Sequence, residues 1–142
     1  MTRSSILLPI GVGLGLALAP LVRAAADGAT VTSSLTAPWR VAPTGKARVQ
    51  ALAHGKEAWV GKLVLDADAA VPEHQDPAEE FIVVLEGGGR ITVDGTTHDV
   101  KAGSVIYMPA DAIVSYANGP SPMVALQVFA GPEPAAKYEG WK

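Results

Sequence analysis

HQDPAEEFIVVLEG (residues 74–87) and GSVIYMPADAIVSYAN (residues 103–118) are the two segments that decide how this chain folds. Each contains polar residues beside a short apolar run that suits a buried strand. The connection between them, residues 88–102, contains Asp94-Gly95, a pair typical of a two-residue β-hairpin turn. The two segments therefore predict strands that are joined by short turns.

Further short runs, either apolar or alternating between apolar and polar residues, extend this pattern along the chain. The predicted strands are residues 47–53, 58–65, 81–85, 90–93, 98–100, 104–108, 113–116 and 123–129. They are evenly spaced and separated by turn residues, and no internal helix pattern stands out between them. The sequence therefore predicts an all-β fold, either a sandwich or a barrel.

The first 26 residues have the three parts of a secretory signal peptide. Arg3 provides the basic start, a run of apolar residues follows, and Ala24–Ala26 offer a cleavage site of small residues. Pro9 and Pro20 interrupt the apolar run, which is also short for a membrane anchor. We predict cleavage near Ala26, no stable membrane insertion afterwards, and a periplasmic or secreted protein.

Length and composition predict one domain without disulfides. A chain of 142 residues with 49% hydrophobic content suits one core, and the absence of cysteine leaves packing as the source of stability. Loss of Arg3 and Arg23 with the signal peptide would change the net charge from −3 to −5, so no nucleic-acid partner is expected. The predicted parts are a signal peptide (1–26), an extended arm (27–45), the barrel (46–130) and a tail (131–142) with aromatic residues packed over the outside.

The two quoted segments resemble the paired motifs of the cupin superfamily. The first cupin motif reads Gly, five residues, His, any residue, His, three or four residues, Glu, six residues, Gly. With its last glycine at Gly87, the motif places Glu80 on the glutamate and Asp76 on the second histidine. His74 then falls on the first histidine and Asp68 on the opening glycine.

The second cupin motif reads Gly, five residues, Pro, any residue, Gly, two residues, His, three residues, Asn. Gly103, Pro109 and Asn118 match it at the required spacings. Asp111 replaces the glycine and Val114 replaces the histidine. The resemblance covers roughly residues 46–130, nearly all of the mature domain, and implies an antiparallel double-stranded β-helix, the cupin jelly roll.

The resemblance also implies where a metal would bind, and this chain departs from the pattern there. Cupins with the full motif hold a divalent metal with three histidines and one glutamate that point into the barrel. The corresponding set here is His74, Asp76 and Glu80, because Val114 has no electron pair to donate. One imidazole and two carboxylates would suit manganese, iron or a similar divalent ion better than copper.

The expected pocket is lined by His74, Asp76, Glu80, Val114 and Tyr116, and three interpretations of it remain open. The first is a residual metal site. The second is a metal-free pocket in which Glu80 and His74 pair with each other and act as acid and base, or fix the polar end of a ligand. In the third, the pocket is vestigial, and the polar residues only satisfy one another or face solvent at the mouth of the barrel. Two inward carboxylates would need a cation, a proton or water between them.

Cupin relatives include dioxygenases, isomerases, decarboxylases and metal-free binding proteins, so the fold does not select a reaction. We favour an exported protein that binds a small polar organic ligand in its pocket without a complete metal site. One alternative is a metal-dependent dioxygenase or isomerase with a non-standard His/Asp/Glu ligand set. The other is a structural or assembly dimer with a vestigial pocket. The resemblance also implies a homodimer, because cupins often associate through sheet edges.

Overall fold

The computed structural model describes residues 28–142, so the predicted signal peptide lies outside the described part of the chain. Within that part are ten strands and one 3-10 helix: β1 (Arg40–Val41), β2 (Ala47–His54), β3 (Trp59–Leu65), β4 (Ala70–His74), β5 (Glu80–Glu86), β6 (Gly88–Val93), β7 (Thr96–Lys101), β8 (Val105–Met108), β9 (Val114–Asn118), β10 (Met123–Phe129) and η1 (Glu133–Gly140). Among these elements, no helix is long and apolar enough to span a membrane.

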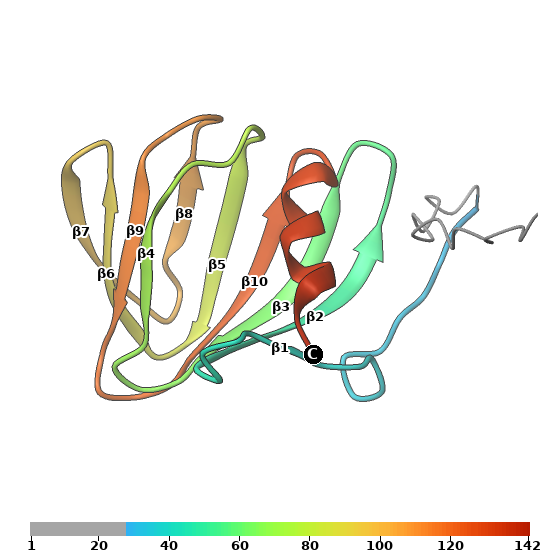
Figure 1. Ribbon diagram of the computed structural model, residues 1–142, viewed down its shortest axis with the longest axis horizontal. Coiled ribbons are helices and arrows are strands. Elements are labelled where there is room, and N and C mark those ends of the chain that lie inside the picture. Colours follow the sequence, from blue (N-terminus) through green and yellow to red (C-terminus); the bar gives the residue numbers. More distant parts are fainter. Residues whose placement is uncertain (1–27) are drawn as a thin grey trace, which may run out of the picture.

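The strands form two antiparallel sheets that face each other, as Figure 1 shows. One sheet has the order β1-β2-β3-β10-β5-β8, and the other has the order β4-β9-β6-β7. Some neighbouring strands come from distant parts of the chain, since β10 lies between β3 and β5 and β9 lies between β4 and β6. The predicted all-β fold is confirmed, apart from the short helix at the C-terminal end.

The main core lies between the two sheets because the strands alternate buried and exposed side chains. On β10 every second residue, from Met123 to Phe129, is buried. On β5 the buried positions are Glu80, Ile82 and Val84, and Glu80 lies opposite Phe129 in the ladder. A side-chain period of two is the mark of strands with one face on a core. The same alternation carries one ionisable residue, Glu80, into the interior.

Three aspartates occupy turn positions that require a left-handed backbone. Asp68 has φ 56° and Asp111 has φ 61°, and these are the two glycine positions of the cupin motifs at which this chain has aspartate instead. Aspartate is one of the few non-glycine residues that adopts this conformation readily. Asp94 (φ 46°) and Gly95 (φ 79°) form the predicted hairpin turn between β6 and β7. The two substitutions therefore keep the backbone turns of the cupin motifs.

The C-terminal segment differs from the predicted tail. Residues 133–140 form helix η1, and Pro134 lies in its first turn, where the missing backbone N–H costs nothing. Tyr138 is only 7% exposed and belongs to a second core cluster with Val49, Trp59 and Phe129. The prediction that the tail packs its aromatic residues over the outside was therefore wrong for Tyr138. Its ring is part of the interior.

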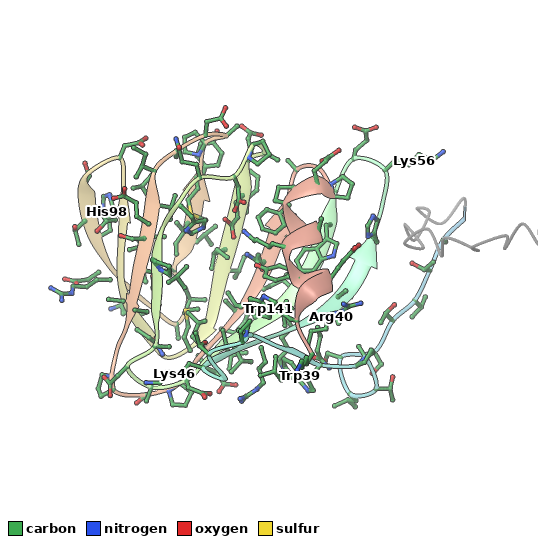
Figure 2. All side chains as sticks on the ribbon, viewed as in Figure 1. Trp39, Arg40, Lys46, Lys56, His98 and Trp141 are labelled. Carbon is green, nitrogen blue, oxygen red and sulfur yellow. The ribbon has the colours of Figure 1, made fainter. Side chains whose placement is uncertain are left out.

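Three sets of contacts hold η1 against the large sheet, in front of β10 and β3 in Figure 1. The ring centroid of Tyr138 lies 5.6 Å from that of Trp59 and 4.8 Å from that of Trp141. Arg40, which Figure 2 labels, donates hydrogen bonds to the carbonyls of Tyr138 and Glu139 near the end of the helix. The last residue of the chain also pairs with β1 through two backbone hydrogen bonds. The C-terminal helix is thus fixed on the barrel.

Candidate functional site

A cavity of about 480 Å³ lies between the two sheets. Most of its wall is apolar, contributed by side chains of β3, β5, β6, β8, β9 and β10: Leu63, Leu65, Ile82, Ile91, Ile106, Met108, Val114 and Met123. Its polar lining includes His74, Gln75, Asp76, Glu80, Gln127 and Lys137. An apolar cavity with a few converging polar groups is the usual form of a small-molecule site.

A chain of hydrogen bonds fixes Glu80 in the wall of the cavity. The hydroxyl of Tyr138 donates to Gln127 Oε1 over 2.9 Å, and Gln127 Nε2 donates to Glu80 Oε1 over 2.6 Å. All three side chains are less than 10% exposed. Because Gln127 follows the inward alternation of β10, it reaches Glu80 across the β5–β10 pair. These two hydrogen bonds link Tyr138 of the C-terminal helix, through Gln127, to the carboxyl group of Glu80 in the cavity.

Asp76 lies beside this chain and is held by a cation from the C-terminal helix. Lys137 Nζ lies 2.7 Å from Asp76 Oδ2, and His74 Nε2 lies 3.8 Å from the same oxygen. Asp76 follows the end of β4, and the backbone N–H of Asp111 donates to its carbonyl over 2.8 Å. The loop after β4, in the first motif, and the loop between β8 and β9, in the second motif, are therefore bound to each other at this end of the cavity.

The orientation of the His74 ring determines which of its nitrogens is available. His74 Nδ1 lies 2.9 Å from the carbonyl oxygen of Pro72, which can only accept a hydrogen bond. Nδ1 therefore carries a proton, and in the neutral ring the free electron pair is on Nε2. His74 pairs with Val114 in the β4–β9 ladder, so the residue opposite the imidazole offers only an apolar surface.

Burial raises the pKa of Glu80 above its ordinary value. The hydrogen bond from Gln127 and the positive charge of Lys137 act in the opposite direction, whereas the nearby Asp76 carboxylate adds to the increase. Burial also raises the pKa of Tyr138, whose hydroxyl stays protonated and donates to Gln127. The cavity thus holds one carboxyl group whose pKa is raised by burial and one that is paired with an ammonium.

Glu80→Gln should stabilise the protein at neutral pH and have little effect in acid. Because the folded-state pKa of Glu80 is raised, its contribution to stability is full below the unfolded-state pKa and is lost as the pH rises through the folded-state pKa. Glutamine cannot ionise and still accepts the bond from Gln127. The expected gain is about 1.4 kcal/mol for each unit of pKa increase.

Urea unfolding from acid to neutral pH would measure this difference. Glu86→Gln on the same strand is the matched control, since Glu86 is exposed and its replacement should change stability little at any pH. If the free energy of unfolding changed with pH in the same way in Glu80→Gln and the wild type, ionisation of the buried carboxyl group would not destabilise the protein.

The donor groups do not fit a divalent metal ion as they are arranged. Across residues 28–142, no three His, Cys, Asp or Glu side chains lie together in a way that could hold a metal. Lys137 binds the carboxylate of Asp76, Gln127 binds that of Glu80, and Val114 offers no electron pair. An ammonium 2.7 Å from Asp76 Oδ2 would repel a cation placed there.

The structure brings all five predicted pocket residues to the cavity: His74, Asp76, Glu80, Val114 and Tyr116 all line it. The suggested pairing of Glu80 with His74 is not what the structure shows, because Glu80 accepts from Gln127 instead. The hydroxyl of Tyr116 donates to Asn118, which in turn donates to three backbone carbonyls. Asn118 therefore holds loops in place.

Sequence reasoning missed the three polar side chains that hold Asp76 and Glu80 in place: Gln127, Lys137 and Tyr138. Gln127 had a signal, because it occupies an inward position in an otherwise apolar strand, where a polar side chain needs a partner. Lys137 and Tyr138 had none, since the pattern of residues 131–142 predicts no contact with the barrel interior.

Comparison with known proteins agrees with this architecture. Residues 61–129 match the family described as "Cupin domain". A curated relative, dimethylsulfoniopropionate lyase DddW of Ruegeria pomeroyi, is 36% identical over 81 residues, which cover 54% of this chain and 53% of the relative. The chain therefore spans about half the length of that protein.

Solved structures with low sequence identity share the fold. An RmlC-like cupin from Shewanella frigidimarina has a TM-score of 0.67 at 18% identity, covering 73% of this chain and 92% of that one. The lyase DddQ from Ruegeria pomeroyi has a TM-score of 0.61 at 18% identity, covering 68% of this chain and 57% of that one. Residues 61–129 therefore form a cupin domain, in agreement with the motif spacings and the two facing sheets, and the solved structures share its fold.

Proposed function

We propose that this protein binds a small organic ligand in its barrel cavity without a bound metal. The observation that carries the proposal is the cavity itself, which has a largely apolar wall and a fixed group of polar side chains that includes Asp76, Glu80 and Lys137. A ligand with an apolar body and one polar end would match both parts of this surface. A volume of about 480 Å³ is within the range of sites for small molecules.

Val114→Phe should block the cavity without disturbing the sheet. Val114 is 7% exposed and faces the cavity from β9, where a phenyl ring would occupy the volume that a ligand needs. The neutral fluorescent probe N-phenyl-1-naphthylamine, which brightens in apolar surroundings, can report on this volume. We expect the variant to bind the probe at least about tenfold more weakly than the wild type.

Val105→Phe is the matched control, because Val105 is 69% exposed on β8 and lies away from the cavity lining. It should bind the probe as the wild type does. Equal loss of binding in both variants, or no binding by the wild type, would contradict a ligand site in the cavity. A panel of small organic acids, alcohols and amines would then be tested for displacement of the probe. The compounds that displace it would identify the polar group of the ligand. Glu80→Gln should weaken that displacement.

The likeness to DddW favours a lyase as a second candidate function. An elimination from a sulfonium carboxylate needs a base that removes a proton from the carbon next to the carboxylate. The electron pair of that C–H bond forms the C=C bond, and the sulfide leaves with the electrons of the C–S bond. His74 Nε2 is a suitable base, because Nδ1 holds the ring proton against Pro72.

Incubation with dimethylsulfoniopropionate tests this candidate by the release of dimethyl sulfide. Turnover by the wild type that is lost in His74→Ala would establish an elimination reaction that uses this imidazole. Absence of product at high protein concentration, with probe binding intact, would leave a binding protein as the function.

We further propose that the protein is exported and forms a homodimer. Export is supported by the sequence of residues 1–26, and the mass of the protein recovered from the producing cells would show whether they are removed. Dimer formation is supported by an exposed apolar group on β5 and β8, which comprises Phe81, Leu85, Val105 and Tyr107. Sedimentation of the wild type and Val105→Lys would test it, and a dimer whose ligand site is inactive would favour an assembly role.

A further inference from the structure

We propose that the ammonium group of Lys137 is the resident cation of this cavity, in the place where metal-binding cupins hold a divalent ion. The inference concerns the same cavity as the proposed function, but it does not depend on the identity of a ligand or on any reaction. It explains how a barrel with donor side chains at three of the four metal-ligand positions can balance their charge without a metal.

The position of Lys137 among the motif residues is the first support. Its Nζ lies 2.7 Å from Asp76 Oδ2, and Asp76 occupies the second histidine position of the cupin motif. His74, at the first histidine position, directs Nε2 towards the same oxygen at 3.8 Å. Lys137 also acts electrostatically on Glu80, at the glutamate position. The ammonium therefore pairs with Asp76, which also lies near His74, and its charge acts on Glu80.

The charge balance of the site is the second support. Two carboxyl groups that line one cavity repel each other when ionised, and they need a positive charge or a proton nearby. Lys137 provides that charge from the protein itself. It is also the only lysine or arginine among the cavity-lining residues of the described chain. A divalent ion entering the cavity would have to displace the ammonium from Asp76 and lose the energy of that ion pair.

The attachment of helix η1 is the third support, because a resident cation must be held in place. Lys137 immediately precedes Tyr138, whose ring packs among Trp59, Phe129 and Trp141. Its own Nζ lies 5.0 Å from the ring centroid of Phe129. The helix end is bound by Arg40 and by the backbone of β1. The lysine is therefore delivered to the cavity by a segment with several independent contacts.

Titration of the wild type and Lys137→Met with Mn²⁺ alone tests the inference, with free Mn²⁺ followed by electron paramagnetic resonance. Removal of the ammonium should free Asp76 and leave His74 and Glu80 beside it, so the variant should bind Mn²⁺ at least about tenfold more tightly than the wild type. Lys101→Met, an exposed lysine on β7, is the matched control and should behave as the wild type. Lys137→Arg keeps the positive charge and should also show no gain.

Stoichiometric binding of Mn²⁺ by the wild type would overturn the inference, and so would unchanged affinity in a folded Lys137→Met protein. If Lys137→Met does not fold, Lys137→Gln provides the same measurement, because it keeps a hydrogen-bond donor for Asp76 without the charge. Probe binding in the cavity is measured separately. If the wild type binds the probe but the Mn²⁺ results differ from those expected, the proposed ligand site stands and the role of Lys137 is wrong. If the Mn²⁺ results are as expected but the wild type does not bind the probe, only the role of Lys137 stands.

Discussion

Tyr138→Ala is expected to lower the free energy of unfolding by about 3–5 kcal/mol, the range typical of replacing a buried aromatic residue with alanine. The ring is 7% exposed and contacts Trp59, Phe129 and Trp141, so its removal leaves a space at the centre of the second core cluster. The same change removes the hydroxyl that donates to Gln127. Urea unfolding followed by tryptophan fluorescence would measure the loss.

Tyr138→Ala should also disturb the part of the cavity wall that helix η1 forms. Without the ring, helix η1 keeps Arg40 and the backbone pairing with β1, but it loses its main packing contact. Lys137 would then no longer be held beside Asp76. We therefore expect weaker probe binding together with the loss of stability, because the helix forms part of the cavity wall.

Tyr138→Phe separates the packing of the ring from its hydrogen bond. Phenylalanine keeps the ring contacts and removes only the 2.9 Å bond to Gln127, which corresponds to about 1 kcal/mol. If Tyr138→Ala and Tyr138→Phe were equally destabilised, the hydrogen-bond chain and not the packing would hold the helix. If neither lost stability, η1 would not contribute to the folded core.

The sequence predicted the barrel well because both of its signals are local. Alternation of apolar residues on strands such as β10 reports which face is buried, and turn residues report where each strand ends. Asp94-Gly95 predicted its hairpin from the φ angles that the turn requires, and the structure has them. Asp68 and Asp111 looked like departures from the cupin motifs, yet they keep the left-handed turns that glycine provides elsewhere.

Two strands were missed because their local signals are weak. β1 has two residues, and it exists because Arg40 and Val41 pair with β2. β4 contains Pro72 and lies at an edge of its sheet, with a register shift between Val71 and His74. Proline is tolerated at such an edge, although it argues against a strand when the sequence is considered alone.

The site could be predicted only in part, because its partners are distant in the sequence. The motif spacing placed His74, Asp76 and Glu80 together, but it could not show which groups they bind. Asp76 meets a lysine 61 positions later in the chain, and Glu80 meets a glutamine 47 positions later. Contacts of this kind depend on the docking of a terminal helix, which tertiary packing decides. A sequence motif such as the cupin motif contains no information about how this helix docks.

Val114→His combined with Lys137→Met should turn the cavity into a metal site. Val114 lies opposite His74 in the β4–β9 ladder and is 7% exposed, so a histidine at this position would direct its ring into the cavity next to the first imidazole. Two imidazoles and two carboxylates form a set suited to Mn²⁺ or Fe²⁺. We expect the double variant to bind Mn²⁺ on the order of 100-fold more tightly than Lys137→Met alone.

Thermal unfolding with and without Mn²⁺ would show this gain as stabilisation. A ligand present at about 100 times its Kd stabilises the folded state by about 2.7 kcal/mol, whereas the metal-free double variant should be less stable than the wild type because it buries an imidazole in an apolar wall. Val105→His with Lys137→Met is the control, since the exposed position 105 cannot reach the cavity. Tight binding by Val114→His alone, with Lys137 intact, would show that the missing imidazole and not the ammonium keeps metal out. Tight binding only in the double variant would assign that role to both residues.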